Sequence, residues 1–151
     1  MGTILITGHK GYIGKNLIHQ FKKNKIPYTT NINTKKKISD VIHLAFKKNI
    51  LNKNFLDNFS LNIKYLQKII NFCKKKNARL IFTSSCMYKS SLKSHKETNS
   101  LFAYDYYSLS KIICENIIKA EIKKHVILRI FNLYGYENFS IIYKIKTKKN
   151  I

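Results

Sequence analysis

The segment "TILITGHKGYIG", residues 3–14, joins an apolar run to a turn that contains three glycines. Residues 3–7 are rich in β-branched side chains, which is typical of a buried strand. Residues 12–24 carry apolar side chains at the spacing of one helical face. Gly8 permits a sharp turn, Gly11 lets the main chain approach a pyrophosphate, and Gly14 lets helix and strand pack tightly. The segment thus predicts a strand–turn–helix whose positive helix end faces phosphate groups, with a plain strand–turn–helix as the alternative.

Strand-like and helix-like segments alternate along the rest of the chain. Apolar runs predict further strands over residues 26–32, 40–46 and 78–85, and a last strand together with its exit over residues 125–135. Helical spacing predicts helices over residues 55–76 and 105–124, the second after a polar loop at 89–103. This alternation predicts an α/β fold with a doubly wound parallel sheet and helices on both faces. Only one helix fits between residues 7 and 40, so one strand and its helix are predicted to be missing.

The composition is that of a folded protein of one domain's length. The chain has 151 residues, 44% of them hydrophobic and 13% aromatic, which excludes an intrinsically disordered protein. No apolar run is long enough for a membrane span and the N-terminus lacks a signal-peptide pattern, so we expect a cytoplasmic protein without a membrane partner. Cys73, Cys86 and Cys114 are widely spaced, which favours reduced thiols over a disulfide framework or a metal site.

The formal net charge of +22 comes almost entirely from lysine, since arginine occurs only at positions 79 and 129. Positive charge of this size can neutralise phosphates, so a basic nucleic-acid-binding protein is one hypothesis. The lysines, however, gather at predicted helix ends and loops and accompany many Asn and Ile residues. This pattern indicates a compositional bias and a solvated surface, so specific nucleic-acid contact is not predicted.

The stretch "YDYYSLSK", residues 104–111, places one tyrosine four residues before a lysine. Residues four apart share a helical face, which pairs Tyr107 with Lys111, whereas Tyr104 and Tyr106 each have a serine at that spacing. A nearby ammonium group lowers the pKa of a phenol, so Tyr107 is predicted to exchange a proton with a substrate hydroxyl. Serines at the end of residues 78–85 lie where a parallel sheet presents its ligand crevice, and they are candidates to hold the substrate oxygen.

The end of the second predicted strand lacks the acidic residue that binds an adenosine ribose in dinucleotide-binding folds. The segment "TTNINTKKK" offers Asn31 or Asn33 as hydrogen-bonding groups for a ribose, and Lys35 to Lys37 as partners for a 2′-phosphate. Both NAD and NADP therefore stay open as cofactors.

Five motifs occur in a fixed order along the chain: "TGHKGYIG", "DVIHLAF", "LIFTSSCMY", "YYSLSK" and "LRIFNLYG". In this order the chain resembles the extended short-chain dehydrogenases/reductases, and more narrowly the NAD(P)-dependent nucleotide-sugar epimerase/dehydratase family. The resemblance implies a Rossmann-like NAD(P)-binding domain over residues 1–136, followed by a short basic tail at 137–151. It also implies a nucleotide-sugar substrate, with a homodimer or a complementing chain as partner.

The resemblance assigns roles to individual residues. Tyr107 would be the catalytic acid/base, and Lys111 would bind the nicotinamide ribose and lower the tyrosine's pKa. Ser84 would hydrogen-bond the reacting oxygen, because the family's hydroxyl residue lies four positions before a tyrosine, here Tyr88; Ser85 is the fallback. The implied cofactor contacts are Gly8, Gly11, Tyr12, Ile13, Gly14, Ala45, Asn62 and Lys111.

The chain also departs from the family pattern. No histidine follows His125, which argues against a keto-sugar epimerase using Cys86, and "SC" replaces the Asp-Glu pair of the sugar 4,6-dehydratases. His43 lies inside an apolar run and is predicted to be a packed core residue. Family members are longer, so the substrate-binding part is predicted to be largely missing. A non-catalytic dinucleotide-binding remnant and one half of a split enzyme are therefore alternative hypotheses.

Overall fold

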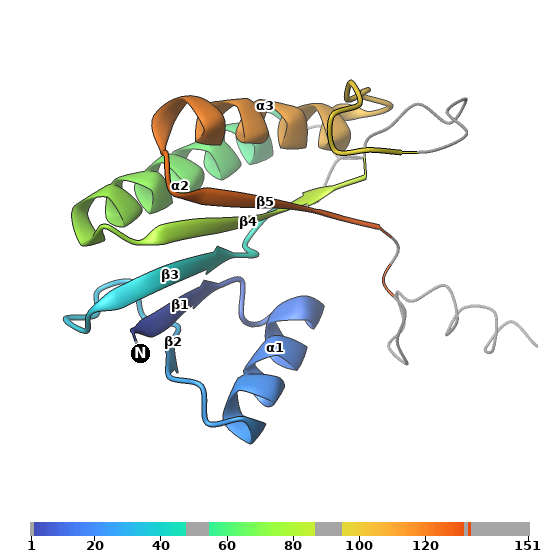
Figure 1. Cartoon of the computed structure of the whole chain (residues 1–151). Helices are drawn as coiled ribbons and strands as arrows, with labels where there is room; N and C mark the ends of the chain where they lie inside the picture. Colours follow the sequence, from blue (N-terminus) through green and yellow to red (C-terminus); the bar gives the residue numbers. More distant parts are fainter. Residues whose placement is uncertain (1, 48–54, 87–94, 132, 134–151) are drawn as a thin grey trace, which may run out of the picture.

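A computed structural model describes residues 2–47, 55–86, 95–131 and 133 of the chain (Figure 1). Five parallel strands form one sheet in the order β2-β1-β3-β4-β5. Helix α1 lies on one face of this sheet, and α2 and α3 lie on the other, which confirms the predicted doubly wound α/β fold. The elements are β1 (Thr3–Thr7), α1 (Tyr12–Lys23), β2 (Tyr28–Thr29), β3 (Ile38–His43), α2 (Phe55–Lys76), β4 (Arg79–Ser85), α3 (Tyr106–Glu121) and β5 (His125–Ile130).

The link between β2 and β3, residues 30–37, contains neither a helix nor a strand. This confirms that the third strand and its helix, usual in this kind of fold, are missing. Strand β1 pairs directly with both neighbours, so that Leu5 is in register with Thr29 on one side and Val41 on the other. The sheet therefore passes from β1 straight to β3.

Strand β2 is much shorter than the predicted strand over residues 26–32. Its chain leaves the sheet because side chains capture the backbone: the Asn31 amide donates to the Thr29 hydroxyl (3.2 Å), and the Asn33 amide donates to the Asn31 side chain (2.9 Å). Such local side chain–backbone bonds compete with a strand ladder. The Asn31 side-chain oxygen, predicted as a ribose partner, thus serves this turn.

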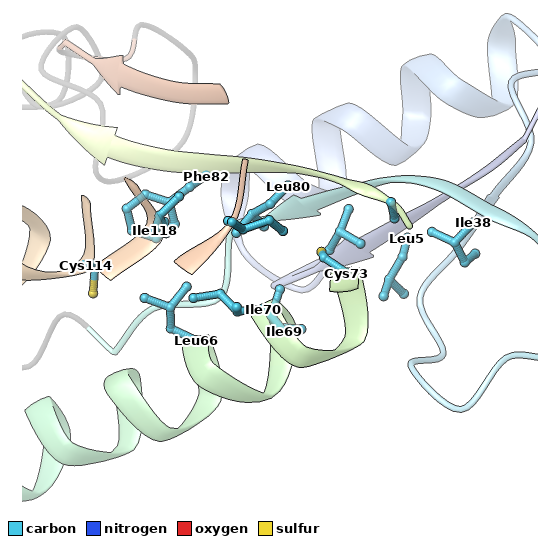
Figure 2. Close-up of a cluster of buried hydrophobic side chains, with 13 residues drawn as sticks. Leu5, Ile38, Leu66, Ile69, Ile70, Cys73, Leu80, Phe82, Cys114 and Ile118 are labelled. Atoms are coloured by element: carbon cyan, nitrogen blue, oxygen red, sulfur yellow. The ribbon is translucent and has the colours of Figure 1, made fainter. Parts of the chain in front are cut away.

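The hydrophobic core fills the space between the sheet and the two helices α2 and α3 (Figure 2). Strands β1, β3 and β4 contribute Leu5, Val41, Leu80 and Phe82, and the helices contribute Leu66, Ile69, Ile70, Cys73, Cys114 and Ile118. The three cysteines are free, and Cys73 and Cys114 are buried as apolar core residues, in agreement with the prediction of reduced thiols.

Helix α3 begins where a capping box closes its first turn. The Asp105 side chain accepts a hydrogen bond from the Ser108 amide (2.7 Å), and the Ser108 hydroxyl accepts one from the Asp105 amide (3.0 Å). These reciprocal bonds satisfy amides that have no partner inside the helix. The cap fixes the helix start at Tyr106, so Tyr107 occupies the first turn and Lys111 lies one turn further on.

Strand β5 forms one edge of the described sheet, and it ends at Ile130, within the segment 125–135 predicted as a strand and its exit. Its alternating side chains face two environments. Ile127 packs against the core, whereas Val126 and Leu128 are 37% and 45% exposed on the opposite side. The predicted basic tail, residues 137–151, lies entirely outside the described residues, and that prediction stays untested.

Among the helices that the structure describes, none has both the length and the apolar character that crossing a membrane requires.

Candidate active site

The glycine turn after β1 is held in a conformation that only glycine adopts easily. Gly8 has a φ of +70°, and a Cβ on it would lie 2.5 Å from the Ala45 main-chain nitrogen. A Cβ on Gly14 would lie 2.5 Å from the Gly8 carbonyl oxygen. Gly8 therefore makes the predicted sharp turn. Gly14 lets α1 pack closely against the backbone of that turn.

Gly11 begins helix α1 and meets a looser environment than the other two glycines. Its amide donates to the Gly8 carbonyl (3.0 Å), and a Cβ on it would lie 3.3 Å from that same oxygen. No side chain caps this helix start, and no acidic residue stands in its first turn. Tyr12 and Ile13 open the helix, and amides at this position point out of the helix end, where the dipole favours an anion.

The segment that follows β3, residues 44–47, lies beside the glycine turn and is fixed at both ends. The Leu44 amide donates to the Thr7 carbonyl (3.2 Å), and Ala45 touches Gly8. The Asn62 side chain holds Lys47 through two bonds, accepting from its amide (2.9 Å) and donating to its carbonyl (3.1 Å). Asn62 was predicted to line the cofactor; in the structure its amide group fixes the segment that carries Ala45.

Lys111 is buried at the centre of the site, with 3% of its surface exposed. Its Nζ donates a hydrogen bond to the Thr83 carbonyl (2.7 Å) and lies 3.8 Å from the centre of the Phe46 ring and 4.6 Å from that of Phe82. Burial lowers the pKa of Lys111 to about 8, although Cys114 and Glu115 raise it. The amine is therefore still mostly protonated at neutral pH and loses its proton at a lower pH than an exposed lysine does.

Tyr107 lies near Lys111, as the spacing predicts, but its pKa moves in the other direction. The Nζ of Lys111 is 5.8 Å from the centre of the Tyr107 ring, and that ring packs edge-on against Phe46 at 5.7 Å. Burial raises the pKa of Tyr107, and negative charge on Asp105 and Cys86 raises it further. The predicted lowering by Lys111 is wrong for this arrangement, in which the lysine amine binds the Thr83 carbonyl.

Ser84 is the hydroxyl residue that stands out on β4. It is 5% exposed, and among the described residues its Oγ is the buried side-chain oxygen that has no hydrogen-bond partner. An unsatisfied buried hydroxyl is rare, because burial removes its hydrogen bonds to water. Ser84 follows Thr83, the acceptor for Lys111, so it lies one residue from that contact. The fallback Ser85 is partly exposed, and Tyr88 lies outside the described residues.

His43 is a packed core residue, as the sequence predicts. It is 2% exposed, its ring stacks on Phe82 with centroids 6.0 Å apart, and its Nδ1 lies 2.7 Å from the Thr7 hydroxyl. Burial lowers the pKa of His43 to about 3, and the charge of Lys111 contributes to this. The imidazole is therefore neutral at physiological pH.

These contacts bring four of the predicted residues, Gly8, Ala45, Tyr107 and Lys111, together at the carboxyl ends of β1, β3 and β4. Gly8 touches Ala45, whose neighbour Phe46 contacts both Tyr107 and Lys111. Sequence reasoning missed Phe46 and Thr83. One feature of the sequence could have indicated Phe46, because it directly follows Ala45 at the exit of a strand. Its contacts could not be predicted in this way, because they come from residues more than sixty positions away. Within the described residues, no group of His, Cys, Asp and Glu is arranged to hold a metal ion.

Solved structures with the same fold include three enzymes whose names give a nucleotide sugar as the substrate. UDP-N-acetylglucosamine 4-epimerase from Bacillus cereus is 20% identical with a TM-score of 0.81, covering 98% of this chain and 62% of that one. dTDP-4-dehydrorhamnose reductase from Bacillus anthracis, in complex with NADP, is 18% identical (TM-score 0.80; 99% and 62%). The same reductase from Clostridium acetobutylicum is 21% identical (TM-score 0.77; 96% and 58%). This chain thus spans about three fifths of each solved chain.

Sequence comparison assigns the family. No curated protein matches the chain. The NAD dependent epimerase/dehydratase family, in contrast, matches residues 28–148, from β2 through β5 and beyond. The glycine turn precedes this match, but β1 pairs with β2 and β3 and so joins the turn to the same sheet. The chain therefore belongs to the NAD dependent epimerase/dehydratase family, within the extended short-chain dehydrogenases/reductases.

Proposed function

We propose that this chain binds NAD or NADP and takes part in hydride transfer to or from a nucleotide sugar. The observation that carries the proposal is the convergence of the glycine turn with Tyr107 and Lys111 through the single segment Ala45–Phe46. Family membership supports the nicotinamide cofactor, and the names of the solved relatives support the substrate class.

The phosphate end of the site fits a dinucleotide. A Cβ on Gly11 would approach only the Gly8 carbonyl, so the face of the turn beyond it is open backbone. The uncapped start of α1 adds amide donors and the positive end of a helix dipole, and no acidic side chain in the first turn opposes a phosphate. Gly8, Gly11 and Gly14, with the amides of Tyr12 and Ile13, would hold the pyrophosphate.

The reacting end of the site supplies a proton carrier, a hydrogen-bond donor and a charge. A nicotinamide at this place would supply or accept a hydride. The Tyr107 hydroxyl would give a proton to the sugar oxygen or take one from it, and the Ser84 hydroxyl, unpartnered among the described residues, would hydrogen-bond that oxygen. Lys111 would donate to a ribose hydroxyl, and its positive charge would favour the ionised form of Tyr107 once its amine leaves the Thr83 carbonyl.

The test measures NAD(P) reduction or oxidation by the purified chain with UDP-, GDP- and dTDP-sugars, and compares Tyr107→Phe with Tyr106→Phe. The two tyrosines are neighbours on α3, but Tyr106 is 58% exposed. Loss of general acid–base catalysis should lower turnover by about 10²–10⁴-fold in Tyr107→Phe and leave Tyr106→Phe near the parent rate. Equal turnover in the two variants would contradict the proposed role of Tyr107.

A dinucleotide-binding protein without catalytic activity is a second candidate function. Two observations favour it: the raised pKa of Tyr107, which disfavours proton transfer at neutral pH, and the burial of Lys111. Calorimetry that detects NAD or NADP binding, together with no turnover across the sugar panel, would select this candidate. Turnover that depends on Tyr107 would exclude it.

A further inference from the structure

The aromatic ring of Phe46 covers the ammonium group on which the proposed cofactor site depends. The Lys111 Nζ lies 3.8 Å from the centre of the Phe46 ring, closer than it lies to Phe82 (4.6 Å) or to Tyr107 (5.8 Å). An ammonium at this distance from a ring is attracted to the ring's electron-rich face. Phe46, three residues after the end of β3, thus covers one side of the amine.

Other groups of the protein occupy the directions from which a ligand could accept a hydrogen bond from the Lys111 ammonium. An ammonium has three donors; one is used by the Thr83 carbonyl, and the rings of Phe46 and Phe82 cover further approaches. Only 3% of the residue is exposed. A ribose hydroxyl therefore cannot reach the Nζ while the Phe46 ring stays where it is.

The backbone around Phe46 is fixed, so the side chain is the part that can move. On one side Leu44 is bound to Thr7 and Ala45 packs on Gly8; on the other, the Asn62 side chain holds both main-chain groups of Lys47. Phe46 itself is half-buried, so its ring can turn toward solvent. Rotation of this ring would uncover Lys111 without disturbing the sheet.

The same ring also contacts the proposed acid/base. Phe46 and Tyr107 pack edge to face with centroids 5.7 Å apart, at an interplanar angle of 87°. A rotation of Phe46 would therefore change the surroundings of Tyr107 and Lys111 together. In the covered arrangement the lysine amine is bound to the Thr83 carbonyl and lies 5.8 Å from the centre of the Tyr107 ring.

We propose that Phe46 is a positioning residue that closes the Lys111 ammonium off from ligands and must turn aside before a dinucleotide ribose binds there. The inference deepens the proposed function and rests on it for the identity of the ligand. Access to Lys111 is itself a property of the chain alone, so it can be measured without any cofactor.

The first test measures how fast an amine-reactive acetylating reagent modifies Lys111 at pH 8, by peptide mapping with mass spectrometry. Phe46→Ala should raise the rate at Lys111 by about tenfold, the order expected when a desolvated cation–π contact is lost. Phe102→Ala is the matched control, because Phe102 is 42% exposed and its ring packs on Tyr104. An unchanged rate at Lys111 in folded Phe46→Ala would overturn the proposal.

A second variant separates the loss of the ring from a loss of folding. Phe46→Leu keeps most of the apolar volume but has no aromatic face, so it should also speed the modification of Lys111, while circular dichroism reports a retained fold. If Phe46→Ala unfolds, Phe46→Leu decides the question by the same criterion. A Phe46→Leu protein that is folded and labels at the parent rate would overturn the proposal.

The third measurement is the dissociation constant for NAD and NADP by calorimetry, in the parent chain and in the folded Phe46 variant. Removing a ring that must be displaced should tighten binding several-fold, and bound dinucleotide should protect Lys111 from acetylation. Weaker or equal binding by the variant would overturn the role in ribose access. No binding by either protein, with faster labelling in the variant, would instead refute the proposed function and leave Phe46 as a cover for the lysine.

Discussion

Gly8 and Ala45 touch through their backbones, since a Cβ on Gly8 would lie 2.5 Å from the Ala45 main-chain nitrogen. The contact joins the turn after β1 to the chain after β3, and these two segments carry the glycine loop and the ring of Phe46. A backbone atom cannot yield in the way that the end of a flexible side chain can. The spacing of the glycine turn and the lysine site is therefore set by this contact.

Gly8→Ala should destabilise the chain strongly. The variant combines a positive φ with a clash against main-chain atoms, and we expect the free energy of unfolding to fall by at least about 2 kcal/mol. Gly11→Ala is the control, since Gly11 has an extended φ of −76° and its added Cβ would be 3.3 Å from the nearest oxygen. Urea unfolding followed by circular dichroism measures both; similar midpoints for the two variants would contradict the contact described here.

Ser84→Ala should separate stability from activity. Because the Ser84 Oγ is buried without a partner in the described structure, removing it should leave the free energy of unfolding equal, or higher by up to about 1 kcal/mol. If the hydroxyl holds the reacting oxygen, turnover should fall by about 10²-fold. Ser85→Ala tests the neighbouring position. A loss of turnover in Ser85→Ala but not in Ser84→Ala would move the assignment to Ser85.

Lys111 should make the stability of the chain depend on alkaline pH. Its pKa is lowered to about 8 in the folded chain from an ordinary value of 10.5, so the unfolded chain binds more protons between these limits. Stability from this group therefore rises as pH increases from about 8 toward 10.5, by at most about 1.4 kcal/mol per pH unit, and the penalty is fully present below pH 8.

The measurement compares the parent with Lys111→Met in urea at a series of pH values. The difference between the two proteins removes the contribution of the Cys73 thiol, whose pKa burial raises to about 12, and it reports Lys111 together with its interaction with Cys114, whose pKa burial raises to about 11. Those thiols act in the opposite direction, because the unfolded chain loses their protons first. A difference that stays constant from pH 8 to 10 would show that the lysine titrates normally.

Glu115 should contribute far more to stability than Glu121 on the same helix. Its side chain is fully buried and accepts from Arg129 at 2.8 Å, and the Arg129 guanidinium also donates to the Glu97 carbonyl (2.9 Å). Breaking a buried pair leaves an uncompensated charge, so Glu115→Gln should cost about 3–5 kcal/mol. Glu121→Gln removes an exposed pair with Lys74 and should cost about 1 kcal/mol or less. Thermal or urea unfolding of the two variants compares them directly.

Long periodic segments could be predicted from the sequence because many residues carry the same signal. Helix α2 has the predicted bounds, Phe55–Lys76, since its apolar positions repeat over six turns. Strand β2 could not be bounded in this way. Its end depends on hydrogen bonds of the Thr29 and Asn31 side chains, which compete locally with the strand ladder.

In the site, spacing along one helix predicted which residues are neighbours but not how their charges interact. Tyr107 and Lys111 lie close together on α3, yet the lysine amine turns to a carbonyl on β4 and a ring at the end of β3. Burial then decides both pKa shifts, and burial depends on elements that no local pattern encodes. The same is true of Asn62, whose side chain binds Lys47, fifteen residues earlier in the chain.

Among the described residues, β5 has a neighbouring strand on one side only, and this edge affects how the chain behaves in solution. The unpaired backbone groups of an edge strand are a template for pairing with other chains, and the exposed side chains of Val126 and Leu128 add apolar surface beside them. The net charge of +22 opposes such pairing through mutual repulsion, which counterions weaken as the Debye length shrinks to about 3 Å near 1 M salt. Self-association is therefore expected to increase with ionic strength, so that dilute buffer favours single chains.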